Sequence, residues 1–112
     1  MIEIRYTPKG NSLIVSVIGR LDTATAPTFD RKFQEEVVPG GYKYVVVDLS
    51  KLVYISSLGV SSILIGNKAI TGRGGEFALC GLAGIVRQVF HITGLMTALK
   101  TFEDVDAALS GH

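Results

Sequence analysis

Two adjacent serines, Ser56 and Ser57, carry the side chains of this sequence that are best placed to take part in chemistry. They stand in the stretch YISSLGVSS, residues 54–62, directly after the apolar run YKYVVVDLS. The chain then continues through ILIGNKAI, so a helix is expected to begin near the serines. A hydroxyl at that point has two possible uses: it caps the helix, or it is displayed as a group that another protein modifies.

The start of a helix suits a negative charge. The first backbone N–H groups of a helix have no partner within it, and the macrodipole adds partial positive charge there. A phosphoserine would bring a charge of roughly −1.5 to −2 to this natural anion site. The sequence therefore predicts a position that accepts a large change of charge without unfolding the chain.

One face of the predicted helix carries a stripe of small residues. Gly59, Ser62 and Gly66 fall together on a helical wheel, with Ile63 and Ile70 on either side. Small side chains let a helix lie close to a sheet or to another helix, so this stripe is expected to face inward.

The opposite face is polar and is expected to face outward. It carries Ser57, Ser61 and Lys68, with Leu64 beside them. Leu64 is predicted to be an apolar side chain offered to solvent or to a partner. The alternative, a single scattered surface residue, stays open.

Hydrophobic periodicity predicts elements in the order β-β-α-β-α-β-α-β-α around this helix. Strands are expected over residues 2–6, 12–19, 44–49, 76–81 and 98–102, and helices over 25–38, 55–75, 82–94 and 103–110. The first two strands are joined by a short turn, and the later ones alternate with helices. The predicted fold is α/β, with a single mixed sheet, an N-terminal antiparallel hairpin followed by parallel strands, and about four helices in one domain over residues 1–112.

Two further helices are predicted from apolar residues that recur at helical spacing. These residues are Phe29, Phe33 and Val37 in the first helix, and Ile85, Val89 and Ile92 in the third. Thr25 is the expected N-cap of the first helix, and the residues Pro-Gly-Gly at 39–41 are expected to end it.

Composition excludes several classes of function. The chain has 112 residues, 47% hydrophobic and 19% charged, with 11 basic and 10 acidic residues for a net charge of +1. The charge balance argues against nucleic acid as a partner. No segment approaches the ~20 apolar residues that span a bilayer, and no secretion signal is evident, so no membrane partner and a cytoplasmic location are predicted. The single cysteine, Cys80, is expected to be a buried thiol.

The sequence gives little support for catalysis or for a cofactor. Its two histidines, His91 and His112, are not at metal-binding spacing, and SSLGV lacks the glycine before serine of a nucleophile elbow. The glycine-rich GRGG at 72–75 is followed by neither Lys-Ser nor Lys-Thr, so it is expected to be a turn. No enzyme activity, no metal and no cofactor are predicted.

Two motifs in order resemble a known family. GRLDTATAP, followed after a helix by VVVDLSKLVYISSLGV, resembles the STAS domain of bacterial anti-sigma factor antagonists, and the closing FEDVDAAL is similar to the last helix of that family. The resemblance covers nearly the whole chain. It implies the STAS fold and a regulatory protein that acts by switching partners.

The resemblance also implies roles for individual residues. The family's phosphorylated serine falls on Ser57, and its aspartate after the second strand falls on Asp22. In the family's mechanism the unphosphorylated antagonist binds an anti-sigma factor that is a serine kinase, and so frees the sigma factor. Phosphorylation separates the two, and a serine phosphatase resets the switch. The residues expected to contact the partner are Asp22, Thr23, Ser56, Ser57, Leu58, Ser61, Leu64 and Lys68.

The sequence departs from the family pattern at two positions. Many members have aspartate where this chain has Ser56, so Ser56 is the alternative phosphorylation site. Leu58 is bulky where the family is usually small, which bears on partner choice. Some STAS domains are never phosphorylated and serve as scaffolds or as parts of anion transporters, and this alternative stays open. Alone, the chain is expected to be a monomer.

Overall fold

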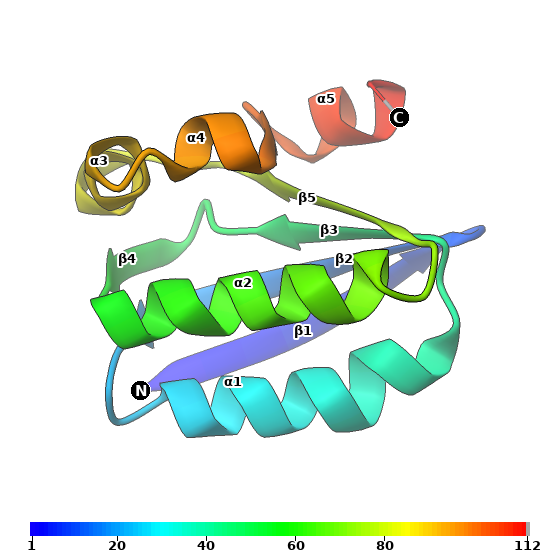
Figure 1. Ribbon diagram of the computed structural model, residues 1–112, viewed down its shortest axis with the longest axis horizontal. Coiled ribbons are helices and arrows are strands. Elements are labelled where there is room, and N and C mark those ends of the chain that lie inside the picture. The colour runs from blue at the N-terminus through cyan, green and yellow to red at the C-terminus, as the bar shows by residue number, and fades with distance from the viewer. Residues whose placement is uncertain (112) are drawn as a thin grey trace.

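Six strands form one mixed sheet in the computed structural model, which describes residues 1–111 (Figure 1). The strands are β1 (Ile2–Lys9), β2 (Ser12–Leu21), β3 (Tyr44–Asp48), β4 (Leu52–Ile55), β5 (Glu76–Cys80) and β6 (Lys100–Phe102). The sheet order is β1-β2-β3-β5-β6, and β4 pairs with β2 off this path. β1 and β2 are antiparallel, and every other pairing is parallel. The predicted mixed sheet with an N-terminal hairpin is confirmed.

In the part of the chain that the structure describes, five α-helices and two short segments of other helix types cover this sheet. The α-helices are α1 (Ala26–Lys32), α2 (Ser57–Thr71), α3 (Gly84–Ile92), α4 (Leu95–Ala98) and α5 (Val105–Ser110). A π-helix, η1 (Phe33–Val37), and a 3₁₀ turn, η2 (Val38–Gly40), continue α1. The first predicted helix is therefore real, but its second half is wound more loosely than an α-helix.

A hydrophobic core lies on each face of the sheet, and one of the two is larger. The larger core joins alternate residues of β2 and β3 to the inward sides of α1, α2 and α3, and includes Val15, Val47 and Ile63. The smaller core lies on the other face, where Ile14, Val46 and other residues pack under α5. Figure 1 shows α1 and α2 side by side on one side of the strands and α5 on the other. α2 is thus a helix with one face in the main core and one face free.

The structure adds two elements that the periodicity did not predict. β4 is only four residues long and lies just before α2. Its apolar residues therefore showed no strand pattern separate from the start of the predicted helix. α4 is a single turn. In α3 the fully buried residues are Val86 and Phe90, whereas Ile85 and Ile92 are 46% and 80% exposed, so the predicted apolar repeat is not the buried face.

The strand β2 changes partner along its length, and this places the candidate site. Its first half, Ser12–Ser16, pairs with β3, and its end, Gly19–Leu21, pairs with β4. The register shifts between Gly19 and Arg20, and Gly19 has a φ of +106°, which a residue with a side chain rarely adopts. The ends of β2 and β4 therefore lie beside each other, with Leu21 opposite Ile55.

The inward stripe of small residues on α2 is confirmed. Gly59, Ser62 and Gly66 are all buried. A Cβ atom at Gly59 would lie 2.5 Å from the carbonyl oxygen of Leu21, and one at Gly66 would lie 3.2 Å from the ring of Phe33. The first turn of α2 is therefore held against the backbone of β2 at a distance that only glycine permits.

We predict that Gly59→Ala destabilises the protein by about 1–3 kcal/mol, because the added methyl group meets a backbone carbonyl that cannot turn aside. Alanine is otherwise the better helix former by about 1 kcal/mol, so a net loss would reflect the close approach. Gly66→Ala is the matched control, since its neighbour is a side chain that can move, and it should cost less. Urea unfolding measures both. A Gly59→Ala variant as stable as the wild type would contradict this packing.

Candidate functional site

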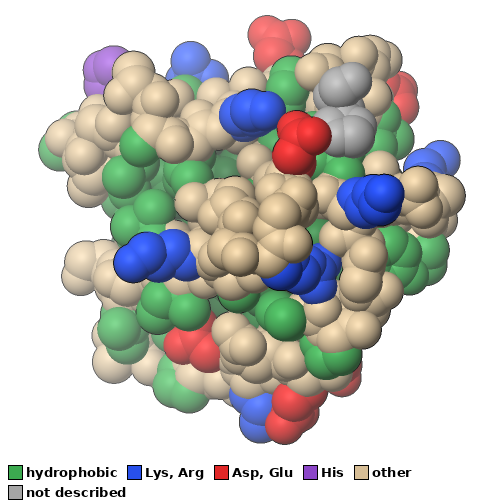
Figure 2. All heavy atoms as spheres, turned by 45° about the vertical axis from the view of Figure 1, so that its right-hand side comes forward, with side chains coloured by type: hydrophobic (Ala, Val, Ile, Leu, Met, Phe, Trp, Pro, Cys, Tyr) green, Lys and Arg blue, Asp and Glu red, His purple; other side chains and the backbone are tan. Residues whose placement is uncertain are grey.

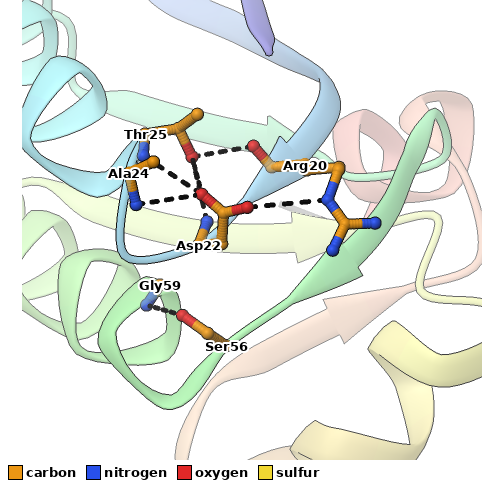
Figure 3. A network of polar contacts seen from close by, with 6 residues as sticks. All are labelled: Arg20, Asp22, Ala24, Thr25, Ser56 and Gly59. Carbon is orange, nitrogen blue, oxygen red and sulfur yellow. Dashed lines mark hydrogen bonds and ion pairs between the residues drawn. The ribbon is translucent and has the colours of Figure 1, made fainter.

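A reciprocal pair of hydrogen bonds closes the loop after β2 (Figure 3). One carboxylate oxygen of Asp22 accepts hydrogen bonds from the backbone N–H groups of Ala24 and Thr25, each at 3.1 Å. In return, the backbone N–H of Asp22 donates to the Thr25 hydroxyl oxygen at 2.9 Å. This exchange has the pattern of a capping box. Thr25 is the N-cap of α1, as predicted, but its side chain accepts no hydrogen bond from the helix. Its hydroxyl instead donates to the carbonyl of Arg20 at 2.8 Å and accepts the N–H of Asp22.

The second carboxylate oxygen of Asp22 faces Arg20. The Nε atom of Arg20 lies 3.5 Å from it, and the guanidinium carbon lies 4.4 Å from the centre of the Tyr54 ring. Partial burial acts to raise the pKa of Asp22, but hydrogen bonds from Thr25, Ala24 and Arg20 outweigh it and hold that pKa below its ordinary value of 3.8. At neutral pH Asp22 is therefore ionised, and its carboxylate accepts hydrogen bonds from its own loop. Thr23 is exposed at the tip of that loop.

Ser56 is the N-cap of α2. It has an extended backbone, with φ −96° and ψ 173°, and its hydroxyl oxygen accepts a hydrogen bond from the N–H of Gly59 at 3.2 Å. Its own N–H donates to the carbonyl of Leu21 at 3.0 Å. Ser56 is half-buried and tied to both β2 and α2, so its hydroxyl already has a structural use.

Ser57 is the first residue of α2, and its side chain is exposed. The capping role therefore falls to Ser56 and not to Ser57. Ser56 caps the helix, and Ser57 is displayed at the end where the helix dipole is positive. Asp22, Thr23, Ser56 and Ser57 come together where β2 and β4 end side by side.

The outward face of α2 extends from Ser57 along the helix. Ser61 and Lys68 are exposed there, as predicted. Leu64 is half-buried and packs against the main core, so the prediction that it is offered to solvent is corrected. The exposed apolar side chains are instead Leu58, at 44%, and Ile65, at 53%.

Ile65 was missed by the sequence reasoning, although a signal for it exists. It lies seven residues after Leu58, and therefore on the same side of the helix. With Leu64 and three polar neighbours it lines an open surface depression, whose residues are Ser61, Leu64, Ile65, Asn67 and Lys68. The outward face is thus a mixed surface with an apolar centre, as protein interfaces commonly are.

Other candidate chemistry finds little support. Cys80 is fully buried, as predicted, and burial raises the pKa of its thiol to about 12. Within residues 1–111 no group of three or more His, Cys, Asp and Glu side chains is placed to hold a metal ion, and no helix there has the length and apolar character to cross a membrane. His91 is exposed, and His112 lies outside the described residues. On the face drawn in Figure 2, basic and acidic side chains are interspersed.

Comparison with known proteins identifies the family. The model of the STAS domain matches residues 3–108. BtrV of Bordetella bronchiseptica, a candidate anti-sigma factor antagonist, is 33% identical over 96 residues, which are 86% of this chain and 82% of that protein. The anti-sigma F factor antagonist of Paenibacillus polymyxa is 28% identical over 109 residues, 97% of this chain and 93% of that protein. The crystal structure of an anti-sigma factor antagonist from Mycobacterium paratuberculosis superposes with a TM-score of 0.90 at 24% identity, covering 99% of this chain and 93% of that one.

The chain therefore belongs to the STAS domain family, and its curated relatives are anti-sigma factor antagonists. This confirms the resemblance seen in the GRLD and ISSLGV motifs. It also confirms the prediction that the protein is not an enzyme, since these antagonists are non-enzymatic regulators.

We predict that the Asp22 carboxylate contributes stability at neutral pH that is lost in acid. Because its pKa is lowered in the folded state, this contribution is present above its ordinary value of 3.8 and disappears as the pH falls through the lowered folded value. Asp22→Asn should therefore reduce the free energy of unfolding at pH 7, and the difference from the wild type should shrink below about pH 4. Glu103→Gln, at an exposed carboxyl outside this network, is the control. Urea unfolding across this pH range measures the effect, and a constant difference would contradict it.

Proposed function

We propose that this protein is an anti-sigma factor antagonist that switches partner through phosphorylation of Ser57. Unmodified, it binds an anti-sigma factor that is a serine kinase, and the sigma factor is released. Phosphorylation of Ser57 by that kinase dissociates the complex, and a serine phosphatase restores the first state. The observation that carries this proposal is the division between the two serines, with Ser56 bound as the helix cap and Ser57 exposed beside it.

The geometry favours Ser57 over Ser56 as the phosphate acceptor. A kinase must reach the hydroxyl, and Ser57 is exposed whereas Ser56 is half-buried. A phosphate on Ser56 would also replace an oxygen that already accepts the N–H of Gly59, next to a backbone contact with Leu21. A phosphate on Ser57 disturbs neither contact.

The switch needs no change of fold. A partner that covers Ser57 must desolvate a neutral hydroxyl in one state and a phosphate of roughly −1.5 to −2 charge in the other. The complex is weakened because that charge loses its water. It is weakened further if the charge is repelled by acidic groups or nucleotide phosphates of the partner. Each 1.4 kcal/mol lowers the affinity about tenfold, so a few kcal/mol suffice. In the free protein the same charge lies in water at a positive helix end.

The proposed contact surface runs from the 22–25 loop along α2. Asp22 shapes that loop through its hydrogen bonds, and Thr23 at the tip makes the contact. On α2 the apolar contacts come from Leu58 and Ile65. Further contacts come from Ser61 and Lys68, with Leu64 as the half-buried floor of the depression. Leu58 lies directly after Ser57, so its bulk bears on which kinase fits.

We predict that the purified protein gains one phosphate when it is incubated with ATP and a cognate anti-sigma factor kinase encoded in the same genome. Ser57→Ala should abolish this gain, and Ser56→Ala should retain it, because the second hydroxyl is a cap and not an acceptor. Intact-protein mass spectrometry gives the result. Phosphorylation that persists in Ser57→Ala would move the site to Ser56 or elsewhere. No phosphate with any encoded kinase would leave a STAS scaffold as the better account.

We predict that Ile65→Glu and Lys68→Glu each weaken binding of the unphosphorylated protein to that anti-sigma factor at least tenfold. The first places a charge in the apolar centre of the contact, and the second reverses a charge at its margin. Both residues are exposed, so the melting temperature should change little.

Lys9→Glu is the charge-matched control, since Lys9 is exposed near the β1–β2 turn, away from α2. Isothermal titration calorimetry measures the affinities. Equal losses from the control and from the α2 variants would place the contact elsewhere.

A further inference from the structure

A second surface of the molecule, unrelated to Ser57, is the free margin of the sheet. β1 pairs with β2 on one side, and no other strand within residues 1–111 pairs with it. In Figure 1 β1 lies at the margin beyond β2. β1 is eight residues long, whereas β6 at the other end of the order has three. An unpaired strand of this length presents a row of backbone donors and acceptors that another strand can bind.

The direction of the backbone groups in β1 follows from one hydrogen bond. The N–H of Arg20 donates to the carbonyl of Met1 at 3.1 Å, just beyond the pair of Ile2 and Gly19, so that pair is a non-hydrogen-bonded one. Hydrogen-bonded and non-hydrogen-bonded pairs alternate along an antiparallel ladder. Glu3, Arg5 and the other odd-numbered residues of β1 therefore bond to β2. The even-numbered residues direct their N–H and C=O groups outward.

The outward-directed residues form a short, well-defined pairing segment. They are Ile2, Ile4 and Tyr6, whose side chains are half-buried against the main core. The next even-numbered residue is Pro8, which has no N–H, so the segment ends at Tyr6. Between these residues stand Glu3 and Arg5, with side chains 53% and 67% exposed on the opposite face, where they form an ion pair with each other at 2.5 Å.

This segment is complementary to itself. When two copies run antiparallel about a twofold axis at Ile4, Ile4 lies opposite Ile4, and Ile2 lies opposite Tyr6. These pairs use the outward backbone groups, so they are the hydrogen-bonded pairs. Glu3 then lies opposite Arg5 of the second copy, twice per dimer, at the non-hydrogen-bonded positions where opposed side chains approach most closely.

We propose that β1 binds β1 of a second copy of this chain in that register, so that two sheets join into one. The charge alternation at Glu3 and Arg5 selects a second copy over an unrelated strand, because its own sequence supplies the opposite charge at each position. The pairing does not require Ser57 and is independent of the switch proposed above.

Charge reversal tests the register. In a dimer of Glu3→Arg, arginine lies opposite arginine at both of these positions, and in a dimer of Arg5→Glu, glutamate lies opposite glutamate. Each variant alone should therefore dimerise at least tenfold more weakly than the wild type. When the two variants are mixed, every position again faces its opposite charge, and a heterodimer should form. The double variant Glu3→Arg with Arg5→Glu should recover the wild-type self-association. Sedimentation equilibrium over a range of concentrations measures the wild type, both single variants, their mixture and the double variant, and circular dichroism verifies that each is folded.

Amide hydrogen exchange supplies a second readout. The N–H groups of Ile4 and Tyr6 should become protected as the protein concentration rises, whereas that of Arg5, which already bonds to β2, should not change. The proposal is overturned if the wild type remains monomeric up to about 1 mM. It is equally overturned if self-association survives both single variants, or if mixing them restores nothing.

Discussion

The carbonyl oxygen of Leu21 is the contact on which the candidate site depends. It accepts the N–H of Ser56 at 3.0 Å, and it lies so close to the first turn of α2 that a Cβ atom at Gly59 would stand 2.5 Å away. This contact fixes the end of β2 against the start of α2. Ser56 is thereby turned toward the helix that it caps, and Ser57, one residue later, faces out. The exposed position of the Ser57 hydroxyl is a consequence of backbone packing.

Asp22 and Ser56 act as a matched pair around this contact. One caps the chain as it leaves β2, and the other caps α2 after β4, and both accept backbone N–H groups that would otherwise have no partner. The result is a hydrogen-bonded frame under two exposed residues, Thr23 and Ser57. A partner that binds here meets a preorganised surface, so a change of charge on one hydroxyl is felt in the complex and little in the fold.

Much of this arrangement could be predicted from the sequence, because it rests on local patterns. Buried strands, the small stripe on α2 and the two motifs of the family are all visible as residue types at fixed spacing. What could not be predicted depends on packing between distant segments. β4 is too short for an alternating pattern of apolar residues to be recognised. Which of Leu64 and Ile65 is exposed depends on how α2 is rotated about its axis against the core. Thr25 is the N-cap of α1, but its hydroxyl bonds to Asp22 and Arg20 in the loop and not to the helix, and this depends on how the loop folds back on the end of β2.

The most direct measurement of the central claim is amide hydrogen exchange at Gly59 in the protein before and after phosphorylation of Ser57. If Ser57 projects from a helix start that Ser56 already caps, the amide of Gly59 and those at the end of β2 keep their protection after phosphorylation. Loss of protection at Gly59, spreading to the end of β2, would show that the phosphate enters the packed frame and would contradict the account.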